Sequence, residues 1–265
     1  MIHNVEIRKV NTYKELKNLA KLRKALWPDD GEVALDHMKF IAAHGGIILG
    51  AYVKDQCVGY LYSFPGYQQK QVYLILQNIG VRSDYRQQKI GEALMKRLQL
   101  EALELGYDEI IWTFEPLESI NAHLYLHKMG AVVTEYLINC YENNQSKLPI
   151  DRFLAHWNIT HTQSSHLAEQ LDTSINHTYM IDHKNRTQDQ LEPEILNKST
   201  YVLIPIPSNF STIRSNKETH SWRFFTRSIF HQLLHLNWEV FDLLKNRFSD
   251  ESIYYYVARK TEDYL

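Results

Sequence analysis

The sequence predicts a mixed α/β fold, and the stretch from Val72 to Gly130 carries most of that prediction. An apolar run rich in β-branched residues, Tyr73–Val81, has the composition of a strand. A polar turn follows, and a helix comes next whose apolar residues share one face: Ile90, Leu94, Leu98, Ala102 and Leu105. Gly106 is expected to stop this helix, and Ile110–Phe114 is a second strand that ends before Pro116. Strand, turn, helix and strand in this order predict a βαβ unit, with one more helix before Gly130.

The residues before this stretch are expected to form a strand, two helices and two strands: Val5–Val10, Tyr13–Trp27, Glu32–Ala43, Gly46–Val53 and Cys57–Phe64. Lys54-Asp55-Gln56 has the length and polarity of a hairpin turn between the last two strands. Pro65–Gln71 is expected to be a polar loop that leads into the central strand. The chain therefore enters its central strand from an antiparallel meander.

Beyond Gly130, the apolar runs predict two strands, then a short strand, a helix and two paired strands: Ala131–Tyr141, Asp151–Ile159, Tyr201–Ile206, Glu218–Leu236, Trp238–Leu244 and Ile253–Arg259. Polar residues dominate from Thr160 to Ser199, where Ser165–Leu171 is the one expected helical stretch. We therefore divide the chain into a first domain over residues 1–160, a linker or insertion over 161–199, and a C-terminal αβ extension over 200–265 that packs on the first domain.

Composition narrows the class of protein. The chain has 265 residues, of which 44% are hydrophobic and 23% charged, which is typical of a globular protein. Its formal net charge of −2 gives no support to nucleic-acid binding, and no apolar run approaches membrane-spanning length, so we expect neither nucleic-acid nor membrane partners. Two cysteines, Cys57 and Cys140, are too few for a disulfide framework and favour a cytoplasmic location. His231 and His235 have metal-ligand spacing but lack an evident third ligand, so we expect no metal site.

The turn between the first strand and the helix of the βαβ unit has the chemistry of an anion site. It runs Arg86-Gln87-Gln88-Lys89-Ile90-Gly91. Backbone N–H groups at the start of a helix have no intrahelical acceptor, and the helix dipole places positive charge there. Two cationic side chains add to that charge. The turn is therefore expected to bind a phosphate or pyrophosphate.

The segment YRQQKIGEALM resembles the acyl-CoA-binding motif of the Gcn5-related N-acetyltransferase (GNAT) superfamily. That motif reads Arg/Gln-x-x-Gly-x-Gly/Ala; Arg86 and Gly91 match it, and Lys89 replaces its first glycine. The later segments WTFEPLESINAHLYLHKMGAVV, LPIDRFLAHWNI, YVLIPIPSNF and WRFFTRSIF resemble a bacterial branch of predicted acyltransferases with a TFDPLxSxNA signature and a C-terminal extension. The resemblance implies the GNAT fold: a mixed, mostly antiparallel seven-stranded sheet with a splayed central strand, here followed by a small αβ extension.

The resemblance also implies which residues hold acetyl-CoA or another acyl-CoA. The backbones of Ile79 and Val81 would pair with pantetheine, as an added strand does. The pyrophosphate would lie on the helix start, within the residues Arg86, Gln87, Gln88, Lys89, Gly91 and Glu92. Lys89 weakens this site if the motif needs a positive φ there, and is tolerated if the loop is simply the first helical turn. Ser119 and Asn121 would bond CoA, cap their own helix, or do both.

Catalytic groups are less well defined by the resemblance. The general-acid tyrosine of the superfamily falls on Leu126 here, and Tyr125 is one residue earlier, facing a different way in a regular helix. The central strand carries no carboxylate, so a water held by Gln77 and Asn78 is one candidate acceptor for the amine proton. Glu115, at the end of its strand, is the carboxylate candidate for base or acceptor-orienting work, with a solvated or capping role as the alternative.

The expected function is therefore an acyl-CoA-dependent N-acyltransferase that moves an acetyl group, or another short acyl group such as succinyl, to a small-molecule amine such as an amino acid. Two alternatives stay open, because the usual acid and base are both missing. The chain could be a non-catalytic CoA-binding module, or a protein-interaction scaffold that uses its aromatic tail. The sequence leaves the oligomeric state open, with a homodimer as one option.

Overall fold

The structure is a computed structural model that describes residues 5–28, 31–141, 148–161, 177–184, 186, 190–213, 215–245 and 252–261. The chain forms two compact units. Unit 1 comprises Met1–Trp112 and Asn158–His161, and unit 2 comprises Thr113–Trp157 and Thr162–Leu265. The boundary falls inside a strand, β5 (Glu109–Phe114). The helical stretch expected at Ser165–Leu171 lies outside the described residues.

Unit 1 is a sheet of five strands in the order of the sequence: β1 (Val5–Lys9), β2 (Ile47–Val53), β3 (Gln56–Gln68), β4 (Gln71–Val81) and β5. The first four strands pair antiparallel, and β5 pairs parallel to β4. Among the described residues, the β4–β5 pairing is confined to Leu74–Ile110 and Ile75–Ile111. Beyond Ile75, β4 continues without a strand partner on that side, as expected for a splayed central strand.

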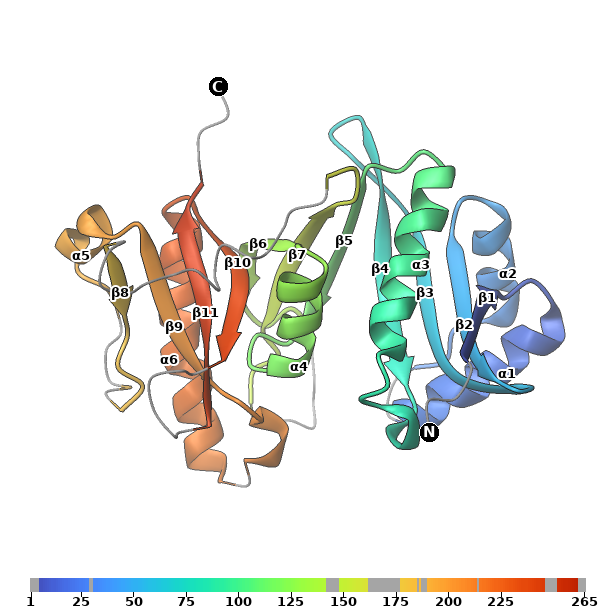
Figure 1. Ribbon diagram of the computed structural model, residues 1–265, viewed down its shortest axis with the longest axis horizontal. Coiled ribbons are helices and arrows are strands. Elements are labelled where there is room, and N and C mark those ends of the chain that lie inside the picture. Colours follow the sequence, from blue (N-terminus) through green and yellow to red (C-terminus); the bar gives the residue numbers. More distant parts are fainter. Residues whose placement is uncertain are drawn as a thin grey trace. The chain divides into compact units, whose positions relative to one another are not determined.

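Three helices cover the two faces of this sheet (Figure 1). α3 (Ile90–Glu104) packs on β2, β3 and β4, while α1 (Tyr13–Leu26) and α2 (Leu35–Ala43) pack together on the opposite face. The Thr12 hydroxyl accepts a hydrogen bond from the Glu15 backbone N–H and so caps the start of α1. At its other end α3 stops where predicted, because Gly106 adopts a φ of +82°. Leu105, predicted on the buried face, lies past the last turn and is half-exposed.

The predicted loop at Pro65–Gln71 is wrong, because most of it is strand. β3 runs on to Gln68 and β4 starts at Gln71, so Gln69 and Lys70 alone form the turn. Both turn residues have positive φ, 51° and 67°, as a two-residue hairpin of this hand requires. Pro65 is tolerated because β2 pairs with β3 only as far as Ser63, which leaves the later part of β3 as an edge.

Unit 2 contains a sheet whose described strands run in the order β7 (Arg152–Asn158), β6 (Val132–Leu137), β10 (Trp238–Lys245), β11 (Ile253–Lys260), β9 (Tyr201–Pro207) and β8 (Thr178–Met180). All its neighbours pair antiparallel except β8 and β9. The C-terminal residues therefore extend a sheet, since β10 pairs with β6 at Val240–Val133. β8 and the short helix α5 (Pro193–Lys198) were not predicted from the sequence.

Helices lie on both faces of the unit 2 sheet. α6 (Asn216–His235) packs on β6, β9 and β10. The opposite face carries α4 (Ser119–Ala122) and the π-helix His123–Lys128 that continues it (Figure 1). The aromatic side chains Trp222 and Phe225 of α6 are buried, each almost inaccessible. No helix in the described part of the chain is both long and apolar enough to span a bilayer. The predicted mixed α/β fold with a mostly antiparallel sheet is confirmed.

Candidate active site

The register of β4 on β3 determines which backbone groups of β4 are free. The Arg82 backbone N–H donates to the Val58 carbonyl oxygen at 2.9 Å, so these two residues form a hydrogen-bonded pair. Val81 lies opposite Gly59 in the next pair along the strands. Antiparallel partners alternate between hydrogen-bonded and non-bonded pairs, so the N–H groups of Ile79 and Val81 point away from β3. Both residues lie past the last β4–β5 pair. They thus offer free backbone donors along the edge of β4.

A β-bulge precedes these residues. The register shifts between Tyr62–Asn78 and Ser63–Leu76, so Gln77 is the extra residue of β4. A bulge increases the local twist, which helps to turn the end of β4 away from a neighbouring strand. The Asn78 Oδ1 atom is buried, and no described residue donates a hydrogen bond to it. The predicted polar pair is therefore split: the Gln77 side chain is exposed, and Asn78 has an unused acceptor.

The turn after β4 has the backbone shape of an anion-binding nest. Gln87 and Lys89 have φ of 62° and 60°, which are left-handed values. Turns of this kind direct consecutive N–H groups into one concavity. The Arg86 side chain crosses back along the turn, and its Nε donates to the Val81 carbonyl oxygen at 3.1 Å. Gln88 Nε2 makes a long contact of 3.5 Å to the Asp84 carbonyl oxygen.

Lys89 is the N-cap residue of α3, with φ 60° and ψ 15°. The position therefore does have the positive φ for which the motif uses glycine, and the interpretation as a plain first helical turn is wrong. No side chain among the described residues caps this helix, so its first N–H groups lack a protein acceptor of that kind. Gly91 is the second residue of α3. Glu92 follows it and pairs with Lys96, with 2.7 Å between Oε1 and Nζ.

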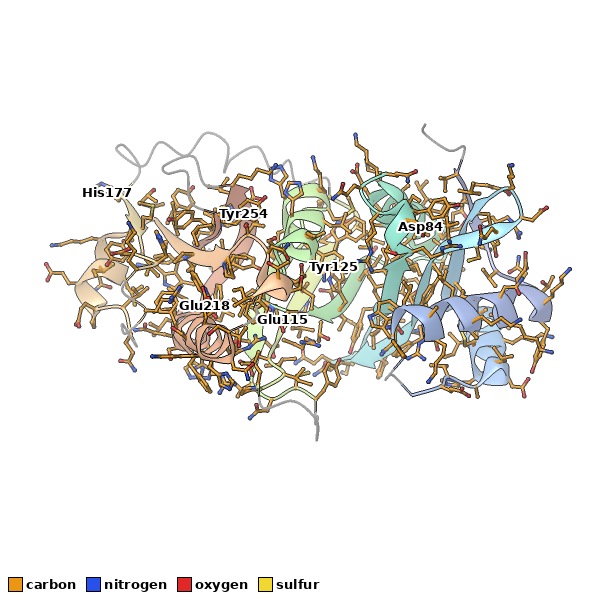
Figure 2. All side chains as sticks on the ribbon, turned by 90° about the horizontal axis from the view of Figure 1, so that it is seen from below. Asp84, Glu115, Tyr125, His177, Glu218 and Tyr254 are labelled. Carbon is orange, nitrogen blue, oxygen red and sulfur yellow. The ribbon has the colours of Figure 1, made fainter. Side chains whose placement is uncertain are left out.

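Glu115, just beyond the end of β5, has both carboxylate oxygens occupied. Oε1 accepts the Leu117 backbone N–H at 3.0 Å. Oε2 accepts Nη2 of Arg223 at 2.6 Å and Nη1 of Arg152 at 3.3 Å. Figure 2 shows the place of Glu115 in unit 2. A carboxylate held by two guanidinium groups is suited to orienting a neighbouring group, because its charge is already compensated.

Ser119 and Asn121 do not cap α4. The N-cap residue is Glu118, and Ser119 is the first helical residue. The Ser119 side chain is fully buried, and its Oγ donates to the Ser208 carbonyl oxygen at 2.5 Å. Asn121, two residues on, is half-buried. The capping alternative for these two residues is therefore wrong, and Ser119 instead bonds the loop after β9.

The helix that carries Tyr125 is not regular. Residues His123–Lys128 form a π-helix, and the Met129 N–H donates to the Leu124 carbonyl oxygen five residues back, at 3.1 Å. A π-turn contains one residue more than an α-helical turn. Residues before it therefore face the direction that the next residue along the chain would face in a regular α-helix. The regular-helix register predicted for this segment is therefore wrong. Counted across the insertion, Tyr125 rather than Leu126 corresponds to the tyrosine position of the motif.

Tyr125 itself is buried, with a 5% exposed side chain. Its ring packs edge-on against Phe114, the last residue of β5, at a centroid distance of 5.3 Å. Burial raises the pKa of the Tyr125 hydroxyl, so this group stays protonated over the physiological pH range. It can therefore donate a hydrogen bond or a proton, but cannot serve as a resting base.

The predicted site residues thus fall into two sets, one in each unit. Unit 1 brings Asn78, Ile79, Val81 and the turn from Arg86 to Glu92 together around the end of β4 and the start of α3. Unit 2 brings Glu115 and Ser119 together with the C-terminal extension. Two residues were missed, Arg152 and Arg223. For Arg223 a sequence signal was available, since it directly follows Trp222 in a predicted helix rich in aromatic residues.

Comparisons with known proteins agree with this geometry. Residues 13–131 match the Acetyltransferase (GNAT) family. No protein of curated function matches the chain in sequence. Among solved structures, an N-acetyltransferase from Staphylococcus aureus Mu50 is similar, with 15% identity, a TM-score of 0.51, and 59% of this chain and 99% of that chain covered.

Two further solved structures that match this chain are ribosomal-protein N-acetyltransferases. The ribosomal-protein-S18-alanine N-acetyltransferase from Escherichia coli has 15% identity and a TM-score of 0.49, with 63% of this chain and 99% of that chain covered. The ribosomal-protein-alanine N-acetyltransferase from Brucella melitensis has 21% identity and a TM-score of 0.49, with 57% and 98% covered. On the family match, residues 13–131 of this chain are a domain of the acetyltransferase (GNAT) family.

Proposed function

We propose that this chain is an acyl-CoA-dependent N-acyltransferase that transfers an acetyl or other short acyl group to a small-molecule amine. The observation that carries the proposal is the combination of a free β4 edge at Ile79 and Val81 with the uncapped start of α3. The first offers backbone donors along an extended ligand, and the second offers N–H groups and positive charge to a phosphate. Acyl-CoA has both parts.

The residues of unit 1 divide the work of holding acyl-CoA. Pantetheine pairs with the edge of β4, and the pyrophosphate lies on the N–H groups of the turn, from Gln87 to Gly91. Arg86 and Lys89, both exposed, add positive charge beside it. The absence of a side chain on Gly91 lets a phosphate oxygen approach the backbone closely.

The chemistry is a direct transfer. The neutral amine attacks the carbonyl carbon of the thioester and the carbon–sulfur bond breaks. The amine proton passes to water, and the departing thiolate takes a proton from water, so CoA leaves as its thiol. A backbone N–H near Ile79 stabilises the developing negative charge on the carbonyl oxygen. Within unit 2, burial keeps the Tyr125 hydroxyl protonated, so it is a candidate hydrogen-bond donor, and Glu115 is the candidate carboxylate for orienting an acceptor.

We place this reaction in the cytoplasm, because both cysteines, Cys57 and Cys140, are free thiols. No cluster of His, Cys, Asp and Glu among the described residues has the arrangement of a metal site.

Thiol release tests the proposal directly. Purified protein is mixed with acetyl-CoA or succinyl-CoA and a panel of amino acids and simple amines, and free CoA thiol is followed with a chromogenic disulfide. At least one pair should give turnover that depends on both substrates. A protein that binds CoA but releases no thiol with any amine would be a non-catalytic CoA-binding module, the alternative favoured by the fully occupied Glu115 carboxylate.

A further inference from the structure

Three arginines and two carboxylates form a cluster inside unit 2. We call it the arginine cluster: Arg152, Arg223, Arg227, Glu115 and Asp151. The two carboxylates come from the end of β5 and the start of β7, and two of the arginines lie one turn apart on α6. The cluster therefore ties the C-terminal extension to the residue that follows β5.

One half of this cluster is complete. Asp151 is fully buried and accepts a bidentate pair from Arg227, with Nε–Oδ2 at 2.8 Å and Nη2–Oδ1 at 2.9 Å. The Tyr136 hydroxyl donates to Oδ2 at 2.7 Å, and the Asn139 backbone N–H donates to Oδ1 at 3.1 Å. The charges of Asp151 and Arg227 therefore compensate each other, and this half of the cluster is a structural ion pair.

The other half is incomplete. Arg223 is 1% exposed, and its Nη2 donates to Glu115. Its Nε and Nη1 are buried and make no hydrogen bond within the described part of the chain. The Tyr136 hydroxyl gives its hydrogen to Asp151, and its oxygen is a second hydrogen-bond acceptor beside the Arg223 guanidinium, which leaves Nε and Nη1 as the donors without a partner. Burial lowers the pKa of Arg223, but the Glu115 carboxylate outweighs this and the pKa is raised, so the side chain keeps its charge.

A buried guanidinium with unused donors is costly to the folded protein. Each unsatisfied buried donor forfeits its hydrogen bonds to water, and a buried charge needs close to full compensation. Glu115 is shared with Arg152, so it compensates two cations with a single charge. An anion that reached Arg223 would supply the missing acceptor and the missing charge together.

Two members of the cluster are partly exposed. The side chains of Arg152 and Glu115 are 25% and 24% exposed, whereas that of Arg223 is 1% exposed. The rings of Tyr141, 5.6 Å from the Arg152 guanidinium carbon, and Phe210, 5.7 Å from that of Arg223, flank these cations. A small planar anion with an apolar portion fits such surroundings, since a guanidinium group matches a carboxylate in shape and donor spacing.

We propose that Arg223 and Arg152 form a carboxylate-binding site, and that the reaction handled by this chain involves a substrate carrying a carboxylate. The inference rests on the proposed function. The carboxylate has two sources: the acceptor, as in an amino acid, or the acyl chain of the donor, as in a succinyl group. In both cases Glu115 serves as a positioning residue, because it fixes Nη2 of Arg223 and leaves the remaining donors to the ligand.

Matched substrates separate the two sources. With acetyl-CoA as donor, L-leucine is compared with L-leucinamide and with isoamylamine, which keep the amine and remove the carboxylate. With isoamylamine as acceptor, succinyl-CoA is compared with acetyl-CoA. We expect one arm to show a preference of about 10²-fold or more in kcat/KM for the carboxylate-bearing substrate, because a site built on buried charges rejects ligands that leave them unpaired.

Two variants assign that preference to the cluster. Arg223→Lys keeps the charge but loses the fork of donors, and Arg152→Gln changes a partly exposed side chain that tolerates substitution. Each should lower the preference about tenfold or more, through a higher KM for the carboxylate-bearing substrate. Arg259→Gln, which alters a different ion pair in the same unit, should leave the preference intact. Melting curves check that each variant is folded.

The proposal is overturned if carboxylate-bearing and uncharged substrates react equally well in both arms, or if Arg223→Lys and Arg152→Gln preserve the preference. Should no pair release thiol, the proposed function fails and the site is tested by binding alone. Succinate, but not succinamide, should then raise the melting temperature of the unaltered protein and not that of Arg223→Lys. Equal shifts of the melting temperature with succinate and succinamide would refute the carboxylate-binding site as well.

Discussion

Lys89 provides the sharpest test of the turn between β4 and α3. This non-glycine residue has φ 60° and ψ 15° and occupies the N-cap position, where the family motif has glycine. Glycine, methionine and valine differ in the conformational free energy that a residue pays at positive φ, so replacing Lys89 by each of them tests this geometry. Methionine keeps an unbranched side chain and removes only the charge, so it is the matched reference for the other two.

The magnitudes follow from the left-handed geometry. A non-glycine residue there costs about 1–2 kcal/mol, and glycine avoids this cost but adds about 0.4–1 kcal/mol of unfolded-state entropy. Relative to Lys89→Met, Lys89→Gly should therefore change the free energy of unfolding by between about zero and +1.6 kcal/mol. Lys89→Val should lose about 1–2 kcal/mol, because a β-branched side chain is poorly tolerated at positive φ.

Denaturant titration of the three variants measures these differences. The free energy of unfolding should be highest for the glycine variant, intermediate for the methionine variant and lowest for the valine variant. The valine variant should be about 2 kcal/mol less stable than the glycine variant. CoA affinity should fall by a similar factor, about two- to fivefold, in glycine and methionine, since both remove one charge near the phosphates. Equal stability of the glycine and valine variants would refute the left-handed geometry, and with it the nest.

Three further predictions concern other parts of the chain. Trp222→Ala should destabilise the protein by about 3–5 kcal/mol in denaturant titration, because the side chain is 2% exposed; unchanged stability would mean that this face of α6 is not part of a core. At saturating CoA, Tyr125→Phe should lower the rate of thiol release less than about tenfold, and Glu115→Gln should lower it by about 10²-fold or more. A larger loss in Tyr125→Phe than in Glu115→Gln would make Tyr125 the more important group. The hydrogen bond from Arg8 lowers the pKa of Glu15 from 4.5 to about 2, so its contribution to stability is complete above about pH 4.5 and lost as the pH falls towards 2. Glu15→Gln should remove that part of the acid transition, and an unchanged acid limb of the stability curve would speak against this pair.

The sequence predicted the strands and long helices well because their periodicity is local. It failed at Pro65–Gln71, where polar residues and a proline indicate a loop. The segment is strand because β2 ends its pairing at Ser63, which leaves an edge that accepts proline. The turn at Gln69 and Lys70 lacks the Asn-Gly signature of its class, so no local signal marked it.

The irregular helix after Ser119 was hidden for a different reason. A π-turn depends on which side chains are buried on either side of it, and apolar spacing in a short segment does not define it. Tyr125 and Leu126 are adjacent and both are buried, which a single apolar stripe does not accommodate. Reading the segment as a regular helix therefore displaced the tyrosine from its motif position.

The candidate site was predictable where it rests on a local motif and not where it rests on distant residues. The turn from Arg86 to Gly91 could be read from the chain, because strand, turn and helix are contiguous. The partners of Glu115 could not, since Arg223 lies far along the sequence, and only the tertiary fold brings its guanidinium to 2.6 Å from that carboxylate. Arginines on a helix face predicted to be buried are the signal to follow in similar sequences.

The central claim is that the start of α3 binds the phosphates of CoA, and calorimetric titration of CoA into Gly91→Asp tests it most directly. An aspartate in the first turn of a helix favours the fold, through the helix dipole, but repels phosphate. Gly31→Asp is the matched control, because a Cβ at Gly31 meets nothing within 4 Å. The account predicts that Gly91→Asp is folded and binds CoA about 10²-fold more weakly or not at all, while Gly31→Asp binds CoA normally. Unchanged CoA affinity in folded Gly91→Asp would contradict it.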